Sequence, residues 1–227
     1  MKYVFSFLAL FLILCTSYNS NVDASSSERV VNGLKEALTV GVQEAVKKTG
    51  VEDGFYQNPN IKIPLPEQLK KVDNYLKKFG GEAASEALVK KMNRAAEKAA
   101  PEAIAIFIKA ITDIKIDDGL KILNGGKTAA TEYLKSSTFE ALINSFSPVI
   151  KKSMEEVNGI KTYNDYISKN SLILKSMDIN LDINNHVAVK SVEGLFKMIA
   201  VEEQKIRENP EARVNDLLKD VFGGLFK

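Results

Sequence analysis

Residues 54–66, GFYQNPNIKIPLP, constrain the fold of this chain most, because they hold three of its six prolines. Each proline lacks an amide donor and pushes the residue before it toward an extended backbone. A helix cannot run through this stretch. Its apolar residues alternate with lysine and proline, which predicts a short extended segment over about residues 60–65 with one buried face. These apolar residues are Ile61, Ile63 and Leu65.

Two uses fit the 54–66 segment. Its apolar side chains can plug a core between helices, as a structural clamp. Together with the residues before them, they can also form a wall of a binding groove, because a proline-stiffened wall loses little entropy when a ligand binds. We expect the clamp first and the ligand wall second. The candidate binding residues are Phe55, Tyr56, Asn58, Ile61, Ile63 and Leu65.

Apolar residues at three- and four-residue steps predict helices over most of the remaining chain. The predicted helices cover about residues 27–49, 67–79, 82–99, 103–111, 117–123, 128–134, 139–157 and 187–208, and a last helix begins at Pro210. Residues 103–111 are apolar apart from Lys109, so we expect this helix to be buried on every side. Pro148 is expected to kink or split its helix.

Residues 160–183 have the weakest helical pattern. Within them, Ile179, Leu181 and Ile183 alternate with polar residues, which predicts a second extended segment over about residues 178–183. We hypothesise that the two extended segments pair or cover the same seam. The predicted fold is therefore all-α, a single-domain multi-helix bundle with one or two short extended segments.

The N-terminus has the features of an export signal. A lysine precedes an apolar run over residues 4–14, which is shorter than the roughly 20 residues of a membrane-spanning helix. Residues 22–24, VDA, suit a signal peptidase, so we expect cleavage after Ala24 and a mature domain of residues 25–227 in the periplasm or cell envelope. A lipid anchor at Cys15 or a retained N-terminal anchor is the alternative. The residue before Cys15 is bulky where a lipoprotein signal has a small one.

After residue 24 the chain has 30 basic residues, 28 acidic residues and no cysteine. Disulfides are therefore excluded, although an exported protein meets an oxidising compartment. The balanced charge gives no overall field to attract nucleic acid, and we expect no nucleic-acid partner. Residues 67–98 are an exception, with eight basic and five acidic residues, and this basic stretch can contact an anionic membrane surface.

Several motifs of catalysis and ligation are incomplete. Lys127 and Thr128 follow a glycine as in a phosphate-binding loop, but the earlier glycine of that motif is replaced by Lys121. We expect a glycine that ends one helix, followed by the N-terminus of the next. The exposed amides there can still bind an anion weakly. Residues 178–183 begin like a calcium loop without its turn glycine or closing glutamate. His186 is the only histidine, so we expect a structural role for it and no metal site, no cofactor and no catalytic residue.

One ionic cluster is more specific. Glu203 lies on the apolar stripe of the helix predicted over residues 187–208, and Arg207 follows it at i+4. Arg213 comes just after the proline that ends this helix. A carboxylate on an apolar stripe needs partners, so we predict a partly buried ion-pair network of Glu203, Arg207 and Arg213 that links the last helices. A solvated ion pair and a ligand-binding role are the alternatives.

The chain resembles a known family in four separated stretches. They are GLKEALTVGVQEAV at 33–46, DGFYQNPNIKIPLP at 53–66, DDGLKILNGGKTAATEYL at 117–134 and VEGLFKMIAVEEQKIRENPEARVNDLLKDVFG at 192–223. These are similar to bacterial exported proteins grouped as domain of unknown function 4197. The resemblance implies an exported, mostly helical single domain and brings no established activity or catalytic residues.

With no catalytic motif, we expect a non-enzymatic envelope protein that binds a small apolar or amphipathic, lipid-like ligand or an exported protein partner. A structural or assembly role at the envelope or membrane surface is the alternative. A hydrolase that uses a pair of carboxylates is less favoured, because the acidic residues show no signature spacing.

Overall fold

The computed structural model describes residues 4–78, 82–171 and 181–209, with side chains from residue 27 on except residues 75, 76, 82 and 84. No strand occurs among these residues, and the helices form one bundle, as predicted. The elements are α1 (Val4–Thr49), α2 (Glu67–Lys77), α3 (Glu82–Ala99), a 3-10 turn η1 (Ala100–Glu102), α4 (Ala103–Thr112), α5 (Ile116–Leu123), α6 (Ala129–Glu156), α7 (Gly159–Lys169) and α9 (Ile183–Glu208).

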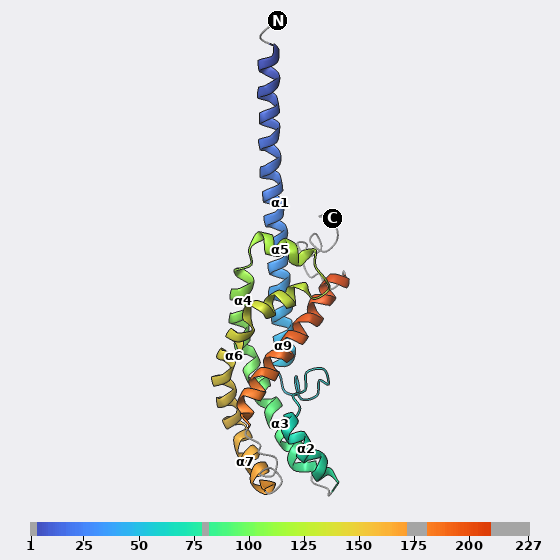
Figure 1. The fold of residues 1–227 in the computed structure, drawn as a ribbon, viewed down its shortest axis with the longest axis vertical. Helices are drawn as coiled ribbons and strands as arrows, with labels where there is room; N and C mark the ends of the chain where they lie inside the picture. Colours follow the sequence, from blue (N-terminus) through green and yellow to red (C-terminus); the bar gives the residue numbers. More distant parts are fainter. Residues whose placement is uncertain (1–3, 79–81, 172–180, 210–227) are drawn as a thin grey trace.

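The bundle is elongated (Figure 1). α1 enters the bundle from one end and extends well beyond it, while α2 and α7 lie at the opposite end. α6 packs against α9, α3 and α4, and α1 packs against α9, α4 and α5. The 54–66 segment connects α1 to α2 and crosses beside α3 and α9. It therefore lies among three helices that come from different parts of the chain.

The core follows the predicted helical stripes. On α1, Leu34, Leu38, Val42 and Ala45 are buried, as their spacing indicates. Aromatic rings fill the centre: Phe107 meets Phe196 edge to face, with ring centroids 5.4 Å apart. Phe139 stacks on the same ring, with centroids 6.3 Å apart. Such aromatic pairs add to the stabilisation that burial alone gives.

A glycine sets the contact between α5 and α1. A Cβ atom at Gly119 would lie 2.7 Å from both methyl carbons of Val31, which is too close for any side chain. The backbone of α5 at Gly119 therefore packs directly against the side chain of Val31 on α1. This contact positions the end of α5, which matters for the ion-pair network described below.

Three sequence-based expectations for helices are wrong. The first helix was expected to begin near residue 27, whereas α1 begins at Val4. α4 is fully buried only along Ala103, Phe107 and Ile111, while Ala105 and Lys109 are exposed, so it is not buried on every side. α4 has more apolar residues than the neighbouring helices cover, so some of them are exposed. The helices predicted over residues 128–134 and 139–157 are one helix, α6, which continues through Pro148.

The polar middle of α6 joins its two predicted halves, and its hydroxyl groups bond to the backbone of the preceding turn. The hydroxyls of Ser136 and Ser137 donate to the Tyr133 carbonyl at 2.8 and 2.9 Å, and Thr138 donates to the Leu134 carbonyl at 2.6 Å. Pro148 is exposed, so the carbonyl that loses its helical partner faces the water side of the helix.

The region 160–183 is more helical than predicted. α7 buries Tyr166. Polar residues separate Tyr166 from the other apolar residues of this helix, so the helical pattern is weak in the sequence. α9 begins at Ile183 because the Asp182 carboxylate accepts the Asn185 amide at 2.9 Å, so the second extended segment does not include Ile183. Residues 178–180 lie outside the described part, and the pairing hypothesis stays a prediction. Among the residues searched, no helix is long and apolar enough to cross a membrane.

Candidate functional site

The 54–66 segment is bound to α3 by a side chain that substitutes for a neighbouring strand. The Ile63 amide donates to Oδ1 of Asn93 at 2.8 Å, and Nδ2 of Asn93 donates to the Ile63 carbonyl at 2.9 Å. The same Nδ2 donates to the Val89 carbonyl one turn back on α3. Asn93 is fully buried. One amide group therefore satisfies both backbone groups of a residue that has no strand beside it.

Glu97 binds the start of the same segment. Its Oε1 accepts the amides of Phe55 and Tyr56, each at 3.1 Å, and its Oε2 accepts Nη1 of Arg94 at 2.6 Å. Arg94 also donates to Asp53 at 2.7 Å. Asp53 has a φ of 67°, a left-handed conformation that costs energy for a residue other than glycine. This ionic group therefore holds the turn that ends α1 and directs the chain onto α3.

α9 holds the opposite side of the segment. Nζ of Lys197 donates to the Asn60 carbonyl at 3.2 Å. The side-chain amide nitrogen of Asn58 lies 3.6 Å from the sulfur of Met198. The predicted binding residue Asn58 is thus turned toward α9.

His186 makes a third contact from α9. Its Nε2 lies 2.9 Å from the Pro64 carbonyl, which can only accept, so Nε2 carries the proton. Burial lowers the pKa of this imidazole, and the nearby Lys190 and Lys70 add to the lowering, while the bond to Pro64 and the charge of Glu193 oppose it. His186 therefore favours the neutral form and acts as a fixed donor.

Four of the six predicted binding residues lie in the core. The Phe55 ring packs against α9 where Gly194 stands, and a Cβ there would lie 2.6 Å from the ring. The buried residues are Phe55, Ile61, Ile63 and Leu65. Only Tyr56 and Asn58 are partly exposed. The structural clamp thus accounts for most of the apolar surface of this segment.

A groove of about 670 Å³ runs between the clamp and the helices α2 and α3. Its apolar wall is formed by four residues, which are Pro59, Pro64, Leu65 and Val89. Its polar wall carries three lysines and two acidic residues. The full lining is Pro59, Lys62, Pro64, Leu65, Lys70, Asp73, Asn74, Lys77, Ser85, Glu86 and Val89. The groove is open to solvent and combines positive charge with apolar surface.

The groove lysines pair with carboxylates at its edges. Lys62 lies 3.2 Å from Glu86, and Lys70 lies 2.5 Å from Glu67 on the surface of α2. Such exposed pairs contribute little stability and exchange readily with other anions. An incoming phosphate or carboxylate can therefore compete for these cations.

Tyr56 extends the groove toward α3. Its hydroxyl donates to Glu86 at 2.5 Å, and this bond raises the pKa of the phenol and lowers the pKa of the Glu86 carboxyl. The ammonium of Lys62 lies 4.3 Å from the centre of the ring, within range of a cation–π contact. Tyr56 and Lys62 thus form one partly exposed surface beside the groove.

Two buried polar groups were not predicted, Asp73 in the lining of the groove and Tyr166 on α7. Asp73 is 6% exposed and binds Lys77 at 3.0 Å through Oδ2, while its Oδ1 has no hydrogen-bond partner. The buried hydroxyl of Tyr166 also has none. Burial, followed by the charge of Asp73, raises the pKa of Tyr166 to about 12, so it stays protonated. The sequence could have indicated a buried carboxylate here, because Asp73 follows Val72 on the apolar face of α2.

A second cluster joins the ends of three helices. Glu203 on α9 is 6% exposed, and its carboxylate accepts the amides of Ala130 and Thr131 at 3.0 and 2.9 Å. It also accepts the Thr131 hydroxyl at 2.8 Å and Nε of Arg207 at 2.9 Å. A carboxylate at a helix N-terminus satisfies free amides and complements the helix dipole.

Arg207 performs the complementary task at the C-terminus of α5. Its Nη2 donates to the Ile122 carbonyl at 2.9 Å, and Nη1 donates to the Leu123 carbonyl at 3.3 Å. Glu203 and Arg207 therefore connect α9 to the end of α5 and the start of α6. Arg213, the third residue of the predicted network, lies outside the described residues.

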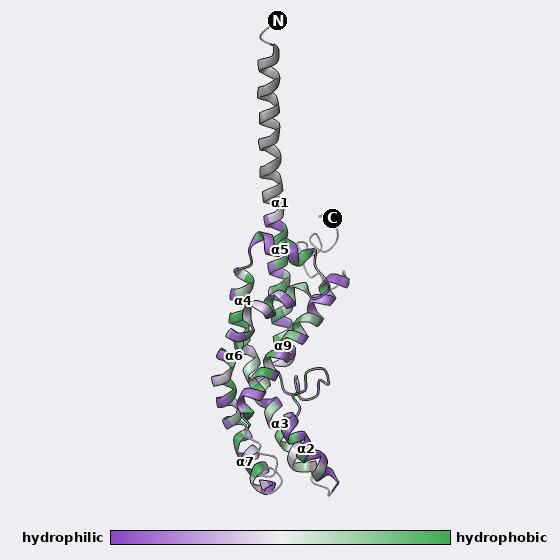
Figure 2. Cartoon of the chain, viewed as in Figure 1, coloured by the Kyte–Doolittle hydropathy of each residue, from purple (hydrophilic) through white to green (hydrophobic). Residues whose placement is uncertain are grey.

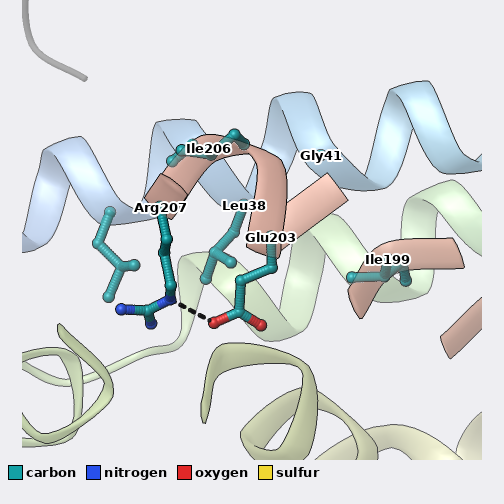
Figure 3. Close-up of a pocket in the computed structure, with 8 residues that line it drawn as sticks. Leu38, Gly41, Ile199, Glu203, Ile206 and Arg207 are labelled. Carbon is teal, nitrogen blue, oxygen red and sulfur yellow. Dashed lines mark hydrogen bonds and ion pairs between the residues drawn. The ribbon is translucent and has the colours of Figure 1, made fainter. Parts of the chain in front are cut away.

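Figure 3 shows this pair beside an apolar hollow between α1 and α9. Leu38 and Gly41 line one side, and Ile199 and Ile206 line the other. Its volume is about 10 Å³, which is room for about one water molecule. The hollow therefore leaves little room for a ligand beside Glu203 and Arg207.

The predicted anion site at the start of α6 is taken by the protein itself. The amides that an anion would need are bonded to Glu203. Lys127 pairs with Glu208 at 2.5 Å, and the hydroxyl of Thr128 donates to Glu132 at 2.9 Å. In the searched part of the chain, no group of three or more histidine, cysteine or acidic residues is placed to hold a metal ion.

Comparison with known protein families identifies the family of this chain. A family model described as "Protein of unknown function (DUF4197)" matches residues 24–223, and the chain belongs to this family. No curated protein and no solved structure matches the chain.

Proposed function

We propose that this member of the DUF4197 family is a non-enzymatic, exported protein of the cell envelope that holds the charged end of an anionic amphipathic molecule. The groove beside the clamp carries the proposal. It places three lysines next to a rigid apolar wall, and an amphipathic acid needs both surfaces. Its volume of about 670 Å³ is in the range of small-molecule sites.

The clamp supports this role by making the wall rigid. Asn93 and Glu97 hold the segment from α3, and His186 holds it from α9. A preorganised wall loses little entropy when a ligand binds. Because Ile61 and Ile63 point into the core, the apolar contact with ligand is limited to the groove rim, which favours a ligand recognised mainly by its charged end.

Export is proposed from the N-terminus. Residues 4–14 have the composition of a signal peptide, and the family model begins at residue 24, beside the expected cleavage site. The proposed working form is therefore the chain from residue 25 on.

Native mass spectrometry of the mature protein, purified gently from its own envelope fraction, tests the proposal. We expect a bound anionic mass that is lost on denaturation. The double variant Lys62→Ala/Lys70→Ala should retain several-fold less of it, whereas Lys151→Ala/Lys161→Ala, two exposed lysines outside the groove, should retain it fully. Lys77 is left in place because its loss would leave the Asp73 carboxylate buried without an ion pair.

A bare monomer from the envelope fraction would contradict the binding proposal. A bare oligomer would also contradict it and would favour the structural or assembly role instead. Equal ligand loss in both double variants would show that the groove is not the site.

A further inference from the structure

The exposed side of α2 carries a stripe of lysines. Lys70 and Lys77 are seven residues apart, as are Lys71 and Lys78, and seven residues make almost two helical turns. The two pairs are adjacent, so they form one stripe along α2 that ends at Lys78, the residue after the helix. The opposite side of α2 buries Leu69 and is part of the core.

The two pairs differ in their partners. Lys70 and Lys77 line the groove and pair with Glu67 and Asp73. Lys71 and Lys78 are exposed, and neither has an ion pair with another described residue. Their charge is therefore not neutralised within the described part of the protein.

The neighbouring surface of α3 continues the positive charge. Lys90 is exposed, also without an ion pair among the described residues, and its ammonium lies 5.8 Å from the ring centre of Tyr56. The guanidinium of Arg94 lies 5.9 Å from the same ring, but its charge is paired with Glu97 and Asp53. A partly exposed tyrosine beside cations is suited to a membrane interface, where its ring meets the headgroup region while its hydroxyl keeps its bond to Glu86.

The position of this surface in the molecule favours contact with an extended partner. α2 and the adjoining part of α3 lie at one end of the elongated bundle, opposite the end from which α1 extends (Figure 1). Hydrophilic residues are prominent along α2 (Figure 2). An end surface can contact a flat bilayer without obstruction by the rest of the bundle.

We propose that the lysine stripe of α2, together with Lys90 and Tyr56, docks the protein onto a bilayer surface that carries acidic phospholipid headgroups. Charge complementarity is the basis, because each lysine near an acidic bilayer strengthens binding about fivefold. The docking goes beyond the proposed ligand binding, since it requires no molecule in the groove.

Co-sedimentation with vesicles tests the docking. The mature protein should bind vesicles of phosphatidylcholine mixed with phosphatidylglycerol, and should bind pure phosphatidylcholine vesicles far more weakly. Raised salt should release it, because the surface charges are screened. The variant Lys71→Gln/Lys78→Gln should bind acidic vesicles about 25-fold more weakly. The matched control Lys151→Gln/Lys161→Gln should change binding less than twofold, and circular dichroism should show that both variants are folded.

Equal binding to both kinds of vesicle, or unchanged binding by the α2 variant, would overturn the docking. So would an equal loss in the control, because it would show a non-specific charge effect. The groove variant Lys62→Ala/Lys70→Ala separates the two proposals. Both proposals are supported if this variant loses the co-purified mass and its vesicle binding falls by no more than about fivefold, the effect of the one stripe lysine that it lacks. If only one of these two results is obtained, the proposal that the other measurement tests is wrong.

Discussion

Asn93 supplies the 54–66 segment with hydrogen bonds that a neighbouring strand would otherwise make. Buried backbone groups must be paired, and proline-rich segments rarely find a regular partner. The side-chain amide has one acceptor and two donors, which match Ile63 and the Val89 carbonyl. A single residue thus determines how closely the segment approaches α3.

Replacing Asn93 by alanine should lower the free energy of unfolding by about 2–4 kcal/mol, because the amide and carbonyl of Ile63 would stay buried without partners. Urea unfolding of the two proteins measures the difference. Asn144→Ala, an exposed asparagine on α6, should stay within about 0.5 kcal/mol of the wild type. A similar small effect for Asn93→Ala would show that water replaces the lost bonds.

His186 gives the fold a dependence on pH. Burial lowers the pKa of its imidazole below the ordinary value of about 6.5, so the unfolded chain binds a proton more readily than the folded one. Its contribution is therefore fully present above about pH 6.5 and is lost as the pH falls through the lower folded value.

The variant His186→Gln keeps a donor for the Pro64 carbonyl but does not titrate. Between about pH 8 and about pH 5.5, wild-type stability should fall more than that of the variant. Chemical unfolding at several pH values measures both curves. Parallel curves would mean that the imidazole has the same pKa in the folded and unfolded chain.

At the scale of elements, the ends of helices matter more than their middles. α9 satisfies the end of α5 with an arginine and the start of α6 with a glutamate, one helical turn apart. The positive charge of Arg207 complements the helix dipole at the C-terminus of α5, and the negative charge of Glu203 complements it at the N-terminus of α6. The short connection between α5 and α6 is therefore held by a helix about 75 residues away in sequence.

Replacing Glu203 by alanine should cost about 3–5 kcal/mol, because Arg207 and two amides of α6 would lose their buried partner. Thermal or urea unfolding measures the loss. Glu140→Ala on the exposed side of α6 is the matched control. In a double-mutant cycle, Arg207→Ala should cost less when Glu203 is already absent, and strictly additive losses would contradict the coupling.

At the scale of the whole molecule, the core begins with the part of α1 near Val30. Val31, Leu34 and Leu38 are at most 5% exposed and pack against other helices. The part of the chain after residue 24 has no cysteine, so its stability depends on this contribution of α1 and on the other buried helix faces.

A chain that begins at residue 25 should unfold cooperatively, whereas one that begins at residue 40 should not fold stably. The shorter chain lacks several buried apolar side chains, and removing one such side chain typically costs about 2–5 kcal/mol. Circular dichroism on heating compares the two. Cooperative unfolding of both at the same temperature would show that α1 is dispensable to the core.

The helical elements were largely predictable because helix formation depends on residues three and four positions apart. The stripe Leu34, Leu38 and Val42 and the end of α1 before Gly50 follow from spacing alone. The same rules failed for α6 and α7, where serine, threonine and tyrosine dilute the apolar pattern. Hydroxyl groups bonded to the preceding turn are not visible in a hydrophobic period.

By itself the sequence determined that the chain is helical, that no helix crosses the prolines at 59–66, and that the part after residue 24 has no disulfide. These properties depend on local spacing, backbone restriction and composition. Only the tertiary structure decided that Asn93 and Glu97 bind the proline segment, that Glu203 occupies the start of α6, and that a lysine-lined groove lies beside the clamp. These contacts join residues 30 to 73 positions apart. No local pattern specifies such pairs, because they form only when distant helix faces pack together.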